Sequence, residues 1–166
     1  MPDDAATNTQ PGGGHSSFKK TTLGGAPGFA QSLRSHVKES PTLQRILLVE
    51  DDVSLATLEA DMLNARGYAV SIATSGEMAI QALQQEIPDL VPLDLDLSSA
   101  TTGWDVFRAL RRYSGTPVLL TSAESAIRSS IRMQGEPRST LDHLPKPYPL
   151  QALLKRIERM LAITPG

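Results

Sequence analysis

Five short apolar runs dominate the chain after residue 44, and each is followed by a segment with helical spacing. The runs predicted as strands are Arg45–Val49, Tyr68–Ala73, Asp89–Leu93, Pro117–Thr121 and Leu141–Leu144. Their length and continuous apolar character are typical of strands that are buried on both faces of a sheet. Because parallel strands need right-handed crossovers, this alternation predicts an α/β fold with a five-stranded, doubly wound parallel sheet and helices on both faces.

The predicted helices are recognised by apolar residues at intervals of three and four. These segments are Leu55, Leu58, Met62 and Ala65; Ala79, Ile80 and Leu83; Asp105 to Arg112; a weaker stretch over 124–134; and Leu150, Leu153, Leu154, Ile157 and Leu161. We expect Gly67 to end the first helix and Thr74 and Glu77 to form a capping box at the second. Pro149 suits the first turn of the last helix.

Residues 1–44 differ in composition from the rest, being rich in Gly, Pro, Ser and Thr. Such a segment buries too little apolar surface to offset the entropy lost on ordering. Phe29, Leu33 and Val37 recur at the spacing of one short helix. We therefore expect a disordered or weakly helical tail over 1–44 and a folded domain over 45–164.

The composition excludes several classes of protein. The chain has no cysteine, which excludes disulfides, zinc–thiolate sites and cysteine nucleophiles and fits a reducing cytoplasm. Its formal charge of −2 offers no general basic surface for nucleic acid. No apolar run is long enough to span a bilayer, and Met1–Ala6 does not begin a signal peptide. We expect a cytoplasmic protein with no direct nucleic-acid or membrane partner.

Polar side chains suited to a metal and a phosphoryl group follow four of the predicted strands. They are Glu50, Asp51 and Asp52 after the first, Asp94 after the third, Ser122 after the fourth and Lys146 after the fifth. Ligands of open parallel sheets gather beyond the carboxyl ends of the strands, so these side chains should meet at one edge. Acids, a hydroxyl and an amine together suit a divalent cation beside a carboxylate that receives a phosphoryl group.

With this spacing, residues 45–162 resemble the receiver domain of bacterial two-component response regulators. The matching stretches are Ile46–Asp52, Pro88–Leu95, Gly103–Trp104, Pro117–Ala123 and Leu144–Tyr148. The resemblance implies the flavodoxin-like strand order 2-1-3-4-5, with Asp94 as the phosphoacceptor. It also implies that Ser122 and Lys146 contact the phosphoryl group, with Thr121 as the fallback for Ser122.

Neighbouring carboxylates repel one another, and a divalent cation relieves this repulsion. We expect Asp51 and Asp94 to bind Mg²⁺ or Mn²⁺ directly, Glu50 to bind it through water, and the backbone carbonyl of Asp96 to add another ligand. Asp52 is the alternative third acid after the first strand.

Three positions depart from the family pattern or from ordinary strand chemistry. Ser98 stands where the family usually has proline, and His143 occupies the family's aromatic switch position. We expect Ser122 and His143 to form a two-state switch, although the charge of a histidine varies near neutral pH. Pro92 lies inside the third strand and cannot donate to the sheet, so we expect either a bulge or an unpaired position there.

The resemblance implies a phosphorylation-dependent signalling switch, whose only catalysis is its own aspartyl phosphorylation and autodephosphorylation. A sensor histidine kinase or phosphotransfer protein would donate the phosphoryl group. We expect no output domain after Gly166, so the expected output is binding to another protein, with a phosphorylation-dependent homodimer as one form. Two alternatives stay open: a receiver-shaped scaffold independent of phosphorylation, and an aspartyl-phosphate phosphatase of the haloacid-dehalogenase type suggested by Asp94 and Asp96.

Overall fold

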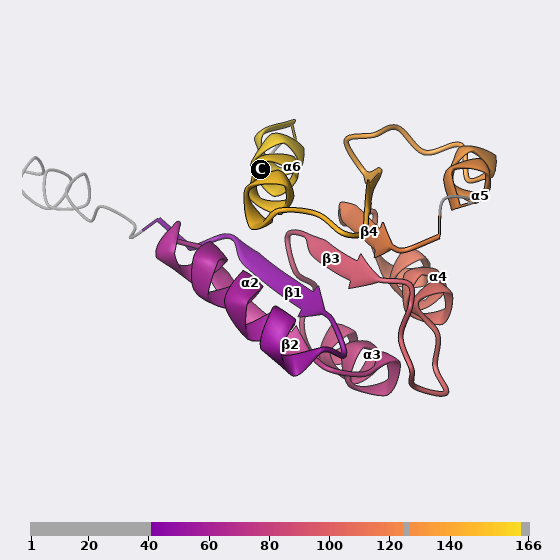
Figure 1. Ribbon diagram of the computed structural model, residues 1–166, viewed down its shortest axis with the longest axis horizontal. Helices are drawn as coiled ribbons and strands as arrows, with labels where there is room; N and C mark the ends of the chain where they lie inside the picture. Colours follow the sequence, from indigo (N-terminus) through magenta and orange to yellow (C-terminus); the bar gives the residue numbers. More distant parts are fainter. Residues whose placement is uncertain (1–40, 125–126, 164–166) are drawn as a thin grey trace, which may run out of the picture. The chain divides into compact units, whose positions relative to one another are not determined.

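The sheet has five parallel strands in the order β2-β1-β3-β4-β5, as the sequence predicts (Figure 1). The computed structural model describes residues 41–124 and 127–163. The strands are β1 (Arg45–Val49), β2 (Ala69–Ala73), β3 (Val91–Asp94), β4 (Val118–Ser122) and β5 (Leu141–Pro145). The third strand begins two residues later than predicted and includes Asp94, which places this carboxylate at the last position of the strand.

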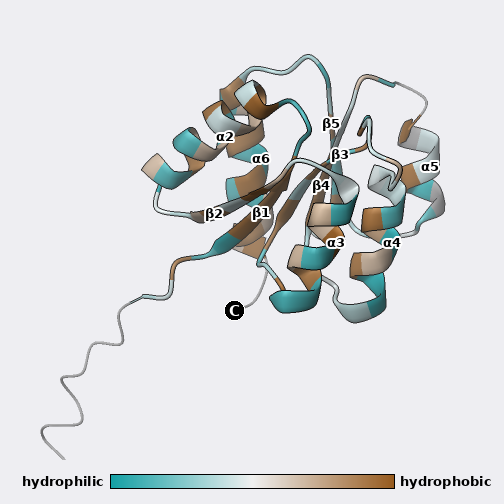
Figure 2. Cartoon of the chain, turned by 90° about the horizontal axis from the view of Figure 1, so that it is seen from below, coloured by the Kyte–Doolittle hydropathy of each residue, from teal (hydrophilic) through white to brown (hydrophobic). Residues whose placement is uncertain are grey.

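Five helices cover the two faces of the sheet. They are α2 (Val53–Ala65), α3 (Gly76–Gln85), α4 (Gly103–Tyr113), α5 (Ile127–Met133) and α6 (Leu150–Ile163). Figures 1 and 2 show α2 and α6 on one face and α3, α4 and α5 on the other. One aliphatic core lies between the sheet and α3 and α4, and a second lies between the sheet, α2 and α6. No helix among the described residues is long and apolar enough to span a membrane.

The buried face of α2 differs from the predicted one. The side chains that face the core are Ala56, Glu59, Ala60 and Leu63. Leu58, which the prediction placed in the core, is 57% exposed. The small Ala56 and Ala60 let the helix approach the sheet closely, whereas a pattern based on large apolar residues selected a different face. The prediction was wrong because it passed over Ala56, Ala60 and the buried acid Glu59.

The first turns of α3 and α4 compare differently with the prediction. Ser75, not Thr74, caps α3: its hydroxyl accepts a hydrogen bond from the Met78 N–H at 3.1 Å. The predicted pair of Thr74 and Glu77 is therefore wrong by one residue. In α4, Thr102 and Asp105 form a full capping box, and Asp105 lies in the first turn as expected.

Pro92 lies in β3, between β1 and β4, without a bulge. The neighbouring residues of β3 donate their N–H groups to β4, so the Pro92 nitrogen faces β1. The pairs Ile46–Leu90 and Val49–Leu93 keep the same register on both sides of the proline. The sheet thus accommodates Pro92 by giving up one hydrogen bond of the β1–β3 ladder.

The expected tail lies almost wholly outside the described residues, including the predicted helix around Phe29, Leu33 and Val37. Residues 41–44 are exposed and form neither helix nor strand.

Candidate functional site

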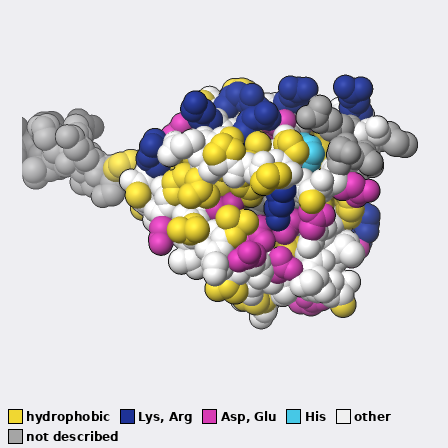
Figure 3. Space-filling model, in the orientation of Figure 1, with side chains coloured by type: hydrophobic (Ala, Val, Ile, Leu, Met, Phe, Trp, Pro, Cys, Tyr) yellow, Lys and Arg dark blue, Asp and Glu magenta, His cyan; other side chains and the backbone are white. Residues whose placement is uncertain are grey.

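Three carboxylates meet at the carboxyl edge of the sheet, where β1 and β3 end. Glu50 and Asp94 are each 2% exposed, and Asp51 is half-buried. One carboxylate oxygen from each of these residues lies within 4.8 Å of the others. Figure 3 shows acidic side chains gathered on this part of the surface. The fold therefore brings together acids from two strand ends that are far apart in the sequence.

The ammonium group of Lys146 lies between two of these acids. Its Nζ is 3.0 Å from Asp94 Oδ2 and 3.2 Å from Glu50 Oε2. Burial lowers the pKa of Lys146, but its hydrogen bonds and ion pairs with Asp94 and Glu50 outweigh burial and raise the pKa overall. Lys146 is held here by the backbone as well, because its N–H donates to the Ser122 carbonyl at 2.8 Å.

The pKa of Glu50 reflects its burial and the charged groups around it. Burial raises its pKa to about 7, against the hydrogen bond from the Asp52 N–H, which lowers it. The charge of Asp94 raises the pKa of Glu50 further, while the charge of Lys146 lowers it. A single ammonium group thus does not compensate these acids fully near neutral pH.

Ser98 holds the third acid of the cluster. Its hydroxyl and its backbone N–H both donate to Asp51 Oδ2, at 2.7 and 2.9 Å. These two hydrogen bonds lower the pKa of Asp51 and outweigh the effect of its partial burial. A proline here would have neither donor, so the departure from the family pattern has a direct consequence at the site.

Asp96 connects the end of β3 with the end of β4. Its N–H donates to Asp94 Oδ1 at 2.8 Å, and its carboxylate accepts from the Ala123 N–H at 2.7 Å. The Ser122 hydroxyl contacts the same carboxylate at 3.4 Å and accepts from the Glu124 N–H at 2.9 Å. Ser122 therefore lies beside the loop that follows Asp94.

Thr121 and Asp52 lie outside this cluster. Thr121 pairs with Asp94 across the ladder, but its side chain interacts with the Tyr148 hydroxyl and lowers the pKa of that group. Since successive side chains of a strand point to opposite faces, this favours Ser122 for the phosphoryl contact. Asp52 instead caps α2 by accepting from the Leu55 N–H at 3.1 Å.

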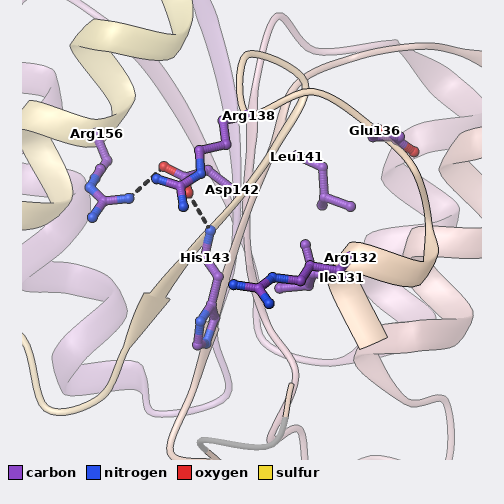
Figure 4. Close-up of a pocket in the computed structure, with 8 residues that line it drawn as sticks. All are labelled: Ile131, Arg132, Glu136, Arg138, Leu141, Asp142, His143 and Arg156. Atoms are coloured by element: carbon purple, nitrogen blue, oxygen red, sulfur yellow. Dashed lines mark hydrogen bonds and ion pairs between the residues drawn. The ribbon is translucent and has the colours of Figure 1, made fainter. Parts of the chain in front are cut away.

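His143 lies apart from the carboxylates, in a pocket of about 430 Å³ lined by α5, β5 and α6 (Figure 4). Figure 4 shows Arg132 and Arg156 on either side of this strand. The neighbouring Asp142 is buried and forms ion pairs with Arg156 and Arg159. None of the three clustered carboxylates lines the pocket, so the switch role of His143 remains a prediction.

The donor set of the cluster fits Mg²⁺ or Mn²⁺. These ions prefer oxygen ligands, and all three clustered side chains are carboxylates. Burial is the main cause of the raised pKa of Glu50, and the charge of Asp94 raises it further; a divalent cation relieves this repulsion. The other described residues contribute no further group of three or more such side chains.

Comparisons with known proteins agree with this geometry. Residues 46–158 match the response regulator receiver domain. The transcriptional regulatory protein BaeR of Escherichia coli is 33% identical over 117 residues, covering 70% of this chain and 48% of that protein. The DNA-binding response regulator MtrA of Mycobacterium tuberculosis is 34% identical over 118 residues, covering 71% of this chain and 50% of MtrA.

Solved structures show the same fold. A response regulator receiver protein from Sinorhizobium medicae has a TM-score of 0.64 at 25% identity, covering 74% of this chain and 97% of that one. The N-terminal domain of a response regulator/sensory box/GGDEF protein from Carboxydothermus hydrogenoformans has a TM-score of 0.60 at 29% identity, covering 72% of this chain and 95% of that one. The chain spans about half the length of BaeR, which is named as a transcriptional regulatory protein, and of MtrA, which is named as a DNA-binding response regulator. The expectation that this chain binds no nucleic acid directly stays a prediction.

Proposed function

The chain belongs to the response-regulator receiver family, and from this premise we propose that it is a switch in which Asp94 receives a phosphoryl group. The donor is a sensor histidine kinase or phosphotransfer protein in the cytoplasm, and the output is binding to another protein. The observation that carries the proposal is the Lys146 ammonium group, which contacts Asp94 and Glu50 beside Asp51. This arrangement supplies the counter-charge that a phosphoryl group on Asp94 needs.

The chemistry follows from the positions of the side chains. A carboxylate oxygen of Asp94 attacks the donor's phosphorus while the bond from phosphorus to the leaving atom breaks, which leaves an acyl phosphate on Asp94. Glu50, Asp51, Asp94 and the Asp96 carbonyl would hold Mg²⁺, which supplies positive charge to the phosphoryl oxygens. Lys146 adds a positive charge that belongs to the chain itself.

Ser122 links the phosphoryl group to the rest of the molecule. Its contact with Asp96 at 3.4 Å is long for a hydrogen bond, so a phosphoryl oxygen on Asp94 offers a better acceptor. The same hydroxyl accepts from the Glu124 N–H, at the start of the segment that leads to α5. Movement of Ser122 would therefore shift this segment and change the surface offered to a downstream protein or a second copy.

Incubation with acetyl phosphate and Mg²⁺ tests the proposal. The intact mass of the wild-type protein should increase by one phosphoryl group, and the modification should vanish in Asp94→Asn and in the presence of EDTA. Asp61→Asn, which changes an exposed acid of α2 outside the cluster, is the matched control and should still be modified. A wild-type protein that stays unmodified would overturn the proposal, and an Asp94→Asn variant modified like wild type would move the acceptor to another residue.

A further inference from the structure

A buried carboxylate lies outside the cluster of Glu50, Asp51 and Asp94. Glu59 of α2 is 1% exposed, and its Oε1 accepts a hydrogen bond from the Tyr148 hydroxyl at 2.8 Å. Burial raises the pKa of Glu59, against the effect of this hydrogen bond. A buried carboxylate that loses its partner carries a large cost, so Glu59 depends on Tyr148.

Both members of this pair belong to segments that carry site residues. Glu59 lies in the helix that directly follows the acidic end of β1, and Tyr148 is two residues after Lys146. The charge of Lys146 lowers the pKa of Glu59, and the charge of Asp94 raises it. Glu59 is therefore within electrostatic reach of the ammonium group on which Asp94 depends.

Several buried acids thus need the positive charge of Lys146. Asp94 and Glu50 hold the ammonium group at 3.0 and 3.2 Å, while Glu59 is a further buried acid that needs a donor. The Tyr148 hydroxyl satisfies Glu59 with a donor that carries no charge. The Lys146 ammonium group therefore stays with Asp94.

We propose that Tyr148 is a positioning residue: its hydroxyl satisfies Glu59 and so leaves Lys146 to Asp94 and Glu50. The inference rests on the proposed function, because the purpose of keeping Lys146 at Asp94 is to receive a phosphoryl group there. It goes further by assigning Tyr148 and Glu59, neither of which belongs to the carboxylate cluster, a part in phosphoryl acceptance.

The variant Tyr148→Phe removes the hydroxyl and keeps the ring. Glu59 then competes for Lys146, so the rate of phosphorylation by acetyl phosphate at saturating Mg²⁺ should fall about tenfold. The double variant Glu59→Leu/Tyr148→Phe removes the competing acid as well and should restore the rate to near that of wild type. Tyr68→Phe is the matched control, because Tyr68 is also half-buried against the core of α2 and α6, and it should leave the rate unchanged.

Thermal unfolding of each variant, with rates measured well below its Tm, separates positioning from stability. A Tyr148→Phe protein that is phosphorylated as fast as wild type would overturn the inference, as would a double variant that stays as slow as Tyr148→Phe. The NMR signal of the Lys146 side chain gives a second readout that needs no phosphorylation. It should shift in Tyr148→Phe and return in the double variant, so it tests the inference even where the wild-type protein accepts no phosphoryl group.

Discussion

At the scale of single residues, Ser98 is the departure from the family pattern that has the clearest effect on contacts at the site. Its two hydrogen bonds reach the same oxygen of Asp51, Oδ2, and fix the orientation of a carboxylate that is proposed to bind Mg²⁺. Hydrogen bonds of this kind orient metal ligands, and their loss commonly weakens metal binding. Asp51 therefore depends on a residue that lies 47 positions away in the sequence.

The variant Ser98→Ala tests this dependence, because it removes the hydroxyl and keeps the backbone N–H. We expect its affinity for Mg²⁺ to fall by up to about tenfold, measured by calorimetric titration. Ser54→Ala in the first turn of α2, an exposed serine, is the matched control and should keep the wild-type affinity. An unchanged affinity in Ser98→Ala would show that Asp51 is oriented without this hydroxyl.

The residues of the site differ in how far the sequence predicts them. Glu50, Asp51, Asp94 and Lys146 were predicted to lie together because each follows a strand, and parallel strands end at one edge. The partnership of Glu59 with Tyr148 was not, since Glu59 lies within a helix and no strand end brings it to Tyr148. The only hint of this partnership in the sequence is an acid, Glu59, at the spacing of the small residues Ala56 and Ala60 on α2.

At the scale of elements, the start of α4 must pass very close to the end of β3. A Cβ added at Gly103 would lie 2.5 Å from the Asp94 carbonyl oxygen and 2.7 Å from the Leu95 Cα. Both neighbours are backbone atoms, so they cannot move aside as a flexible side chain would. Gly103 thus lets the first turn of α4 pack directly behind Asp94, the proposed phosphoacceptor.

Gly103→Ala should therefore destabilise the protein by about 1–3 kcal/mol through overpacking and displace the end of β3. Urea unfolding measures the first effect, and the rate of acetyl phosphate modification measures the second. Gly115→Ala is the control, because a Cβ at Gly115 meets nothing within 4 Å. Equal stability of the two variants would mean that α4 can shift away from β3 at little cost.

The sequence predicted the number and order of the strands and helices, but it predicted less well which face of a helix is buried and where each element begins. The α4 capping box confirms the acid expected in its first turn, since the cap depends on residues three positions apart. The face of α2 depends on which residues the sheet has room for, and local spacing does not contain that information. Pro92 likewise needed the register of both neighbouring strands before its accommodation was clear.

At the scale of the whole molecule, we expect the acidic cluster to couple stability to pH and to divalent cations. The pKa of Glu50 rises from its ordinary value of 4.5 to about 7 in the folded protein, mainly through burial. Below pH 4.5 the carboxyl is protonated in both states and contributes nothing. As the pH rises toward 7, the unfolded chain releases this proton while the folded protein keeps it, so folding becomes less favourable.

Without divalent cations, the free energy of unfolding should therefore fall by about 2 kcal/mol over this interval. Urea unfolding in EDTA at a series of pH values measures the fall, and Glu50→Gln should flatten it. Glu86→Gln, an exposed acid far from the cluster, should leave it unchanged.

Saturating Mg²⁺ binds the ionised carboxylates of the folded state and should raise stability most at the higher pH, by about 2.7 kcal/mol at one hundred times its Kd. A pH dependence that Glu50→Gln and Mg²⁺ both leave intact would place its origin outside the cluster.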